Sequence, residues 1–255
     1  MISNFLEILI LSIVQGISEF LPISSSAHLF LVSEIYKFKS QSLLVDVGLH
    51  LGSLLAIIFY FRNELKEIVN NKNLLFLMVF GSLPLIILGA IIYKTGLINY
   101  FRNIEVIAWT TLIFALLLYI ADKFENNKKI KTDLQLKTIL IIGLFQILAL
   151  IPGVSRSGIV ITAGRFLNFS RYDSTKISFY LSIPAIAGAS FLSLKSLVDK
   201  NIDLNLIVLV SILLSFIFSY LTIKYFLIFV KKFTLSTFVI YRIILSVILF
   251  LTIYT

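Results

Sequence analysis

The 255-residue sequence contains no cysteine and few charged residues. Without cysteine the chain can form neither disulfides nor metal sites with thiolate ligands. Charged residues make up 14% of the chain and hydrophobic residues 59%, whereas a soluble domain has about 25% charged residues and about half apolar ones. The mean hydropathy of +1.01 agrees with this imbalance. The composition therefore excludes an ordinary soluble domain.

Hydrophobic residues are concentrated in six long blocks separated by short polar segments. Each block has about 20 residues, the length that an α-helix needs to cross the roughly 30 Å hydrocarbon core of a bilayer. One such block could form a buried helix of a soluble core, but six blocks indicate a protein that crosses the membrane repeatedly. The predicted spans are residues 43–61, 74–93, 104–121, 177–194, 204–223 and 235–254.

Two further regions contain shorter apolar stretches that polar turns interrupt. The first has a run of serines after Pro22, and the second has a serine-rich turn after Pro152. Irregular backbone is tolerated at membrane depth only where it is buried in protein or lines a cavity. We therefore expect re-entrant helical hairpins at residues 3–36 and 139–168. A single kinked spanning helix in each place is the alternative.

The two interrupted regions resemble each other. FLPISSSA at 20–27 aligns with LIPGVSRSG at 150–158 with one inserted residue, and a glutamine precedes each proline. Such internal symmetry indicates a site at the interface of two repeats, near the middle of the membrane. The sequence predicts an all-α polytopic membrane protein with six transmembrane helices and two re-entrant helical hairpins in two inverted-topology repeats. The first repeat is 1–121, a basic cytoplasmic linker is 122–138, and the second repeat is 139–255.

The net charge of +9 does not indicate nucleic-acid binding, because the basic residues lie in short clusters between the apolar blocks. If both hairpins return to their side of entry, one side of the membrane receives 14 Lys and Arg residues and the other six. The positive-inside rule then places the richer side in the cytoplasm and both termini outside it. The predicted partner is a lipid bilayer, and no nucleic acid is expected.

Polar and ionisable side chains gather in both interrupted regions. Such groups are costly inside a membrane and are therefore candidates for function. The first region brings a carboxylate, an imidazole and three hydroxyls, and the second brings a guanidinium between two hydroxyls. The candidate site residues are Glu19, Ser24, Ser25, Ser26, His28, Ser155, Arg156 and Ser157.

This set of side chains suits a phosphate ester. Arginine binds phosphate oxygens with a planar fork, and helix N-termini add amide donors. Glu19 could hold a divalent metal. A serine beside His28 could be the nucleophile with the imidazole as base, or His28 or Glu19 could activate water directly. The structural alternatives are serines that only pack helices and a Glu19 that only neutralises Arg156.

Three further polar residues lie within predicted spans. His50 and Asp46 are four residues apart on one face of the first span, and we expect them to line the same cavity. Arg242 lies about two turns inside the last span, where it either reaches the membrane interface or supports the site.

Two long motifs resemble those of one protein family. QGISEFLPISSSAHL at 15–29 resembles the first signature of the bacterial undecaprenyl-diphosphatase family, the bacitracin-resistance type of phosphatase. PGVSRSG at 152–158 is similar to its second signature. Segments 50–56, 181–185 and 241–243 also agree in character and order, so the resemblance covers nearly the whole chain.

This resemblance implies a phosphatase of the bacterial inner membrane that converts undecaprenyl pyrophosphate to undecaprenyl phosphate and phosphate. Its implied roles are recycling of the lipid carrier for cell-wall synthesis and bacitracin resistance. The family's proposed nucleophile falls on Ser25, its histidine on His28 and its phosphate-binding arginine on Arg156. The family depends on a divalent cation, Mg²⁺ or Ca²⁺, for which Glu19 and Gln15 are the matching ligands.

The chain departs from the usual family pattern at three places. Gln15 stands where many members have glutamate, which leaves Glu19 as the main acidic metal ligand. Ser26-Ala27 replaces a common Thr-Gly pair, and Val160 stands where threonine often follows the second motif. Each change leaves in place the residues that the proposed chemistry requires.

A transporter of an anionic lipid or phosphorylated solute is the alternative function, since inverted repeats with broken helices are typical of transporters. Transport requires anion binding, whereas a nucleophile beside a base is required only for hydrolysis. The sequence leaves the oligomeric state open between a monomer and a homodimer.

Overall fold

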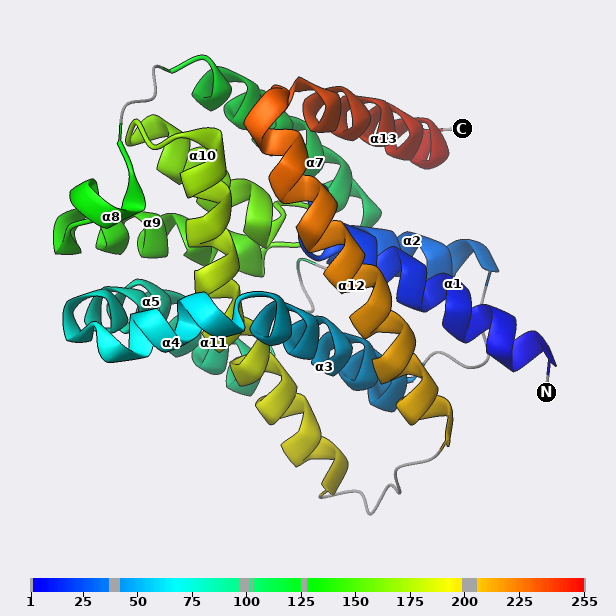
Figure 1. Cartoon of the computed structure of the whole chain (residues 1–255). Helices are drawn as coiled ribbons and strands as arrows, with labels where there is room; N and C mark the ends of the chain where they lie inside the picture. Colours follow the sequence, from blue (N-terminus) through cyan, green and yellow to red (C-terminus); the bar gives the residue numbers. More distant parts are fainter. Residues whose placement is uncertain are drawn as a thin grey trace.

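The computed structural model describes residues 2–36, 42–96, 101, 103–124, 128–198 and 206–254, and this part of the chain is helical (Figure 1). Its one β-type pairing is an isolated bridge between Lys128 and Phe169. Four loop charges used in the topology prediction lie outside the described residues, as do the two terminal residues. These are Lys37, Lys39, Arg102, Lys200, Met1 and Thr255.

Six long apolar helices confirm the six predicted membrane spans. Two of them extend more than one helical turn beyond the predicted blocks, to Arg171 at the start of α11 and to Lys232 at the end of α12. Hydrophobicity marks only the part of a helix inside the hydrocarbon, so polar ends that continue past it are missed. The six are α3 (Leu43–Tyr60), α5 (Lys72–Thr95), α7 (Ile104–Asp122), α11 (Arg171–Val198), α12 (Leu206–Lys232) and α13 (Ser236–Tyr254).

Shorter helices make up the rest of the described chain. α1 (Ile2–Ser18) packs against α2 (Ser25–Tyr36), and α9 (Leu136–Ile147), which continues into the 3₁₀ turn η1 (Leu148–Leu150), packs against α10 (Arg156–Phe166). Each interrupted region thus forms two separate helices packed together rather than one bent helix. Two short helices, α4 (Arg62–Asn70) and α8 (Ile130–Asp133), connect longer ones.

The breaks in these helix pairs follow from local backbone chemistry. Proline lacks an amide hydrogen, so the first helices end before Pro22 and Pro152, at Ser18 and Leu150. Ser24 and Ser155, just before the second helices, have φ angles of 74° and 71°, a left-handed conformation that non-glycine residues rarely adopt. Gly153, with φ of 89°, is in a region that glycine adopts without steric cost.

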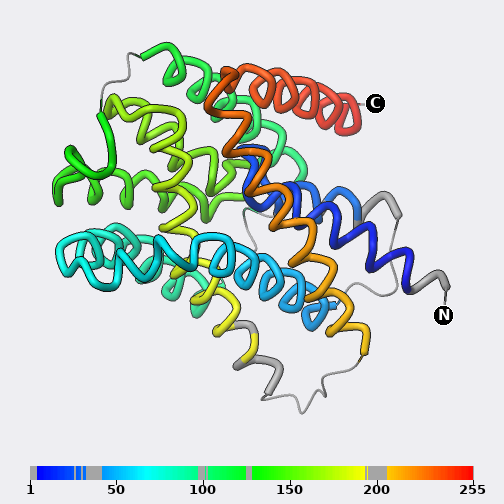
Figure 2. Tube along the Cα trace, in the orientation of Figure 1, coloured from blue at the N-terminus to red at the C-terminus, as the bar shows by residue number. Residues whose placement is uncertain are grey.

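The short helix pairs pack across the molecule onto spans far away in the sequence. α1 lies beside α12 and α9 lies beside α5 (Figure 2). The helices approach each other so closely that two positions have no room for a side chain. A Cβ on Gly16 would lie 2.6 Å from the Cβ of Phe218, and one on Gly143 would lie 2.3 Å from the carbonyl oxygen of Gly81. These contacts hold both polar turns inside the helix bundle.

Asp122 joins several helix ends at one end of the bundle. Its carboxylate pairs with Arg165 at 3.3 Å and Arg171 at 2.6 Å, and it accepts the Leu235 amide at 3.0 Å. The end of α10 therefore lies beside the end of α7 and the segment that leads to α13. Sequence reasoning counted Arg165 only as a loop charge, but its side chain is fully buried.

Candidate active site

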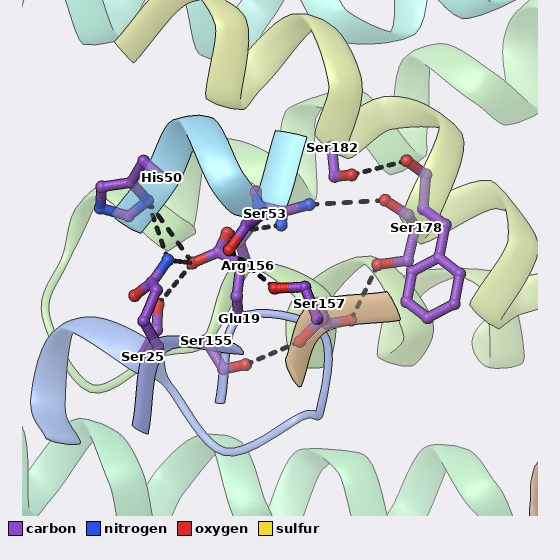
Figure 3. Close-up of polar contacts among 12 residues, drawn as sticks. Glu19, Ser25, His50, Ser53, Ser155, Arg156, Ser157, Ser178 and Ser182 are labelled. Carbon is purple, nitrogen blue, oxygen red and sulfur yellow. Dashed lines mark hydrogen bonds and ion pairs between the residues drawn. The ribbon is translucent and has the colours of Figure 1, made fainter. Parts of the chain in front are cut away.

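Glu19 is the centre of the polar site. It follows the last residue of α1, and its side chain is 7% exposed. One carboxylate oxygen accepts from Arg156 Nη2 at 2.8 Å. The other accepts from Ser25 Oγ at 2.8 Å and from Gln15 Nε2 at 3.0 Å (Figure 3). The structure thus brings both sequence motifs together on one buried carboxylate.

Two helix N-termini meet beside this carboxylate. Ser25 is the first residue of α2 and Arg156 is the first residue of α10, and both donate to Glu19. Ser155 caps α10, because its Oγ accepts the Gly158 amide at 3.1 Å. Helix N-termini present unsatisfied amides and a partial positive charge, so this region is suited to an anion.

The two polar turns also contact each other directly. Ser157 Oγ donates to the carbonyl oxygen of Leu21 at 2.7 Å and lies 3.2 Å from Ser155 Oγ (Figure 3). Arg156 Nη1 reaches the carbonyl oxygen of Ser178 at 3.5 Å. The predicted meeting of the two turns is therefore present, with Ser24 buried at the base of the first. The side chain of Ser26 lies outside the described part of the chain.

His50 joins the site from α3. Its Nδ1 lies 3.0 Å from Gln15 Nε2 and 3.9 Å from a Glu19 oxygen. Because the Gln15 amide nitrogen can only donate, His50 Nδ1 acts as an acceptor in this arrangement. Asp46 lies one helical turn away in the first turn of α3 and is half-buried. Of these two predicted cavity residues, His50 is the one that borders the cavity described below.

His28 lies in a different environment from Glu19. Its Nδ1 is 2.7 Å from the carbonyl oxygen of Ser24, and its Nε2 is 2.5 Å from Tyr241 Oη. The ring stacks on that of Tyr241 with centroids 5.6 Å apart. Sequence reasoning placed His28 beside a serine as its base, whereas the hydroxyl of Ser25 donates to Glu19. The contact with Tyr241 carried no signal in the sequence, since the two residues are far apart along the chain.

A cavity of about 500 Å³ opens next to this cluster. Glu19, His50 and Arg156 form its polar wall, and the remaining lining is mostly apolar and comes from α5, the α9–α10 turn and α11. Small residues keep it open: a Cβ on Gly188 would meet no neighbouring atom within 4 Å, and one on Gly89 would meet only Leu150, at 3.5 Å. The sequence showed these glycines only as small residues within spans. An amphiphile with an anionic head fits such a cavity.

Oxygen atoms that could hold a cation are available at the polar wall. Gln15 Oε1 is buried without a hydrogen-bond partner, next to the carboxylate of Glu19. Within the described residues there is no group of three or more His, Asp or Glu side chains placed to hold a metal. Mg²⁺ is commonly held by one or two carboxylates together with substrate phosphates, so these donors fit a cation that the substrate helps to bind.

Comparisons with known proteins agree with this geometry. A family model described as bacitracin resistance protein BacA matches residues 8–248. An undecaprenyl-diphosphatase of Pelagibacter ubique is 62% identical over 100% of both chains. Undecaprenyl-diphosphatases of Elusimicrobium minutum and Campylobacter curvus are 43% and 41% identical, over 95% and 96% of this chain and 96% and 98% of theirs. The resemblance drawn from the two motifs is confirmed, and the chain belongs to the BacA family of bacitracin resistance proteins.

Proposed function

We propose that this protein is an integral membrane phosphatase that hydrolyses undecaprenyl pyrophosphate to undecaprenyl phosphate and phosphate. In this role it recycles the lipid carrier for cell-wall synthesis in the bacterial inner membrane and confers resistance to bacitracin. The observation that carries the proposal is the cavity whose polar wall is Glu19, His50 and Arg156 and whose other walls are mostly apolar. The names of the relatives supply the identity of the lipid.

In the proposed mechanism, Arg156 and the amides at the starts of α2 and α10 bind the pyrophosphate. Arg156 exchanges its contact with Glu19 for phosphate oxygens, because the guanidinium fork matches both anions. Ser155 and Ser157, with Ser24 and Ser26 of the first turn, are the further hydroxyl candidates for phosphate contacts. This exchange frees one oxygen of Glu19 during turnover.

Ser25 is the proposed nucleophile, and the hydrogen bond that its hydroxyl donates to Glu19 at 2.8 Å supports this role. Its Oγ bonds to the terminal phosphorus while the bond to the bridging oxygen breaks, and that oxygen leaves as part of undecaprenyl phosphate. The Ser25 proton passes to Glu19. Water then hydrolyses the phosphoserine, which restores the hydroxyl and releases phosphate. The sequence-based role of His28 as the base for this serine stays a prediction.

Mg²⁺ or Ca²⁺ is the proposed cofactor. Oxygens of Glu19 and Gln15, together with phosphate oxygens of the substrate, are the ligands that would hold it. When bound, the cation would offset the charge of the phosphates. The remaining steps depend on side chains of the chain itself.

The proposed topology has two re-entrant hairpins, two inverted repeats and both termini outside the cytoplasm. Three observations support the hairpins and the repeats. Ser24 and Ser155 have the same unusual φ at corresponding positions, α1 packs on α12 as α9 packs on α5, and Asp122 draws the end of α10 back to the end of α7. The division into repeats at 1–121 and 139–255 and the homodimer remain predictions.

Hydrolysis and transport are distinguished by an assay in detergent, where no compartments exist. Purified protein is mixed with undecaprenyl pyrophosphate, with and without Mg²⁺ or Ca²⁺, and released phosphate is measured. We expect release only with a divalent cation. If the protein binds the lipid but releases no phosphate with either cation, the phosphatase proposal fails and the transporter alternative takes its place.

A further inference from the structure

Arg242 is a fully buried cation about two turns into the last span, α13. A buried guanidinium is costly unless hydrogen bonds or an anion compensate it. Within the described part of the chain, Arg242 forms no ion pair with a carboxylate. A charge kept at such cost inside a membrane segment requires a specific role.

The hydrogen bonds of Arg242 join the two polar turns. Its Nη2 donates to the carbonyl oxygens of Gly153 at 2.9 Å and Val154 at 3.1 Å. Its Nη1 reaches the carbonyl oxygen of Pro22 at 3.5 Å. The same guanidinium lies against the first turn of α10, since a Cβ on Gly158 would be 3.1 Å from Nη1. One side chain of the last span therefore contacts both motifs.

These carbonyls lie one or two residues upstream of the two left-handed serines. Ser24 and Ser155 have φ angles of 74° and 71°, a conformation that persists only where the surrounding structure fixes it. The next residues are Ser25 and Arg156, and both donate to Glu19. The position of the turn carbonyls thus sets the direction in which both functional side chains leave the backbone.

The neighbouring residue Tyr241 adds a second contact from α13 to the first motif. Its hydroxyl lies 2.5 Å from His28 Nε2, in the first turn of α2, and the two rings stack. The adjacent side chains of Tyr241 and Arg242 therefore hold the start of α2 and both turns together. Neither residue borders the cavity that contains Glu19 and Arg156.

We infer that Arg242 is a positioning residue for phosphoryl transfer: it holds the two turns together and so fixes Ser25 and Arg156 against Glu19. The inference rests on the proposed phosphatase function. Arginine is required because a planar fork with five donors can bond to several carbonyls at once. Lysine keeps the charge, but its compact ammonium cannot reproduce contacts with both turns.

The test compares phosphate release by wild type, Arg242→Lys, Arg156→Lys and the double variant, with thermal unfolding measured in the same detergent. We expect Arg242→Lys to lower kcat about 100-fold, the cost of a misplacement of about 1 Å. Because Arg242 acts partly through Arg156, the double variant should lose clearly less than the product of the two single losses. A merely structural role would leave the two kinetic effects multiplicative.

Arg165→Lys is the matched control. Arg165 is also fully buried and also donates to main-chain carbonyls, those of Asp122, Phe124 and Phe169 at 2.8–2.9 Å, but away from Glu19. The Arg165→Lys substitution should lower the melting temperature and leave kcat of the folded protein within about threefold of wild type. Its effect on kcat should multiply with that of Arg156→Lys. If Arg242→Lys behaves in this way, or keeps the wild-type kcat, the inference is overturned.

Two other outcomes are separated by the same series. If Arg242→Lys yields no folded protein, Arg242→Gln replaces it under the same criteria, because its planar amide can donate to one turn only. If wild type itself releases no phosphate, the proposed function fails. The positioning role is then tested by thermal unfolding, because the Arg242 variants should lose the stabilising ion pair between Arg156 and Glu19. Their thermal stability should then match that of Arg156→Lys, and a wild-type value would contradict the positioning role.

Discussion

Arg156 donates to Glu19 at 2.8 Å, although the two residues are 137 positions apart in the sequence. This ion pair joins the two polar turns, and it satisfies a carboxylate that is otherwise enclosed. A phosphate group resembles the carboxylate as a partner for the guanidinium. In the absence of substrate, Glu19 therefore occupies the place beside Arg156 that a phosphate is expected to take. We expect substrate binding to break the contact between Arg156 and Glu19 in the same step.

The Glu19→Gln substitution separates phosphate binding from chemistry. It keeps the shape of the side chain but removes the anion that competes for Arg156. We expect kcat to fall by about 10²–10⁴-fold, the range for loss of a general base, while affinity for the lipid pyrophosphate in the absence of a divalent cation is kept or increased. Phosphate release and binding of the lipid to detergent-purified protein are the measurements. A variant with wild-type kcat would remove Glu19 from the mechanism.

Ser25→Ala tests whether a covalent intermediate forms. If Ser25 Oγ is the nucleophile, the variant should lose at least about 10³-fold in kcat, because the hydroxyl forms the bond to phosphorus. Rapid quenching of wild type with substrate labelled in the terminal phosphate should trap label on Ser25. Residual activity within tenfold of wild type, without trapped label, would favour direct attack by water with Ser25 only binding phosphate.

The cavity next to Gly188 makes a prediction about chain length. Gly188→Leu places a side chain where a Cβ meets no neighbour within 4 Å, so the protein should fold while the cavity becomes smaller. KM for undecaprenyl pyrophosphate should rise at least about tenfold, whereas hydrolysis of a short prenyl pyrophosphate should change less, because lost apolar burial scales with area.

The same substitution at Gly143 is the contrasting control. There a Cβ would lie 2.3 Å from the carbonyl oxygen of Gly81, so Gly143→Leu should yield little folded protein. If Gly188→Leu leaves the ratio of KM values for long and short substrates unchanged, the apolar part of the cavity does not hold the prenyl chain.

Gln15→Glu tests the proposed cation site. The substitution places a second carboxylate beside Glu19, at the position of an amide whose Oε1 has no hydrogen-bond partner. Two carboxylates attract a divalent cation more strongly than one. Half-maximal activity should therefore require less Mg²⁺ than in wild type, and Mg²⁺ should raise the melting temperature by a larger amount. An unchanged Mg²⁺ requirement would place the cation elsewhere.

Hydrophobic length was sufficient to predict the membrane spans, because the bilayer sets the length of an apolar helix directly. It also indicated that the regions around Pro22 and Pro152 were not ordinary spans, and the chemistry of Glu19, Ser25 and Arg156 was recognisable from their residue types. The pairing of Glu19 with Arg156 was one of the alternatives that the sequence left open, since it depends on how two turns pack against each other.

Residues whose role comes from packing were missed or left undecided. Arg165 looked like a loop charge, yet it is buried against carbonyl groups near Asp122. Arg242 could equally have reached the membrane interface, and only the fold shows that it contacts both turns. Gly188 became informative once the cavity that it lines was known. In each case the partners are distant in the sequence, so neither periodicity nor composition identifies them.

The most direct test of the account compares wild type with Arg156→Ala. Both proteins are purified in the same detergent and supplied with undecaprenyl pyrophosphate and Mg²⁺, and the released phosphate is measured along with the melting temperature. The account predicts steady release by wild type and loss of at least about 10³-fold in Arg156→Ala, because the phosphate clamp is gone. Release by a folded Arg156→Ala protein at the wild-type rate would contradict it.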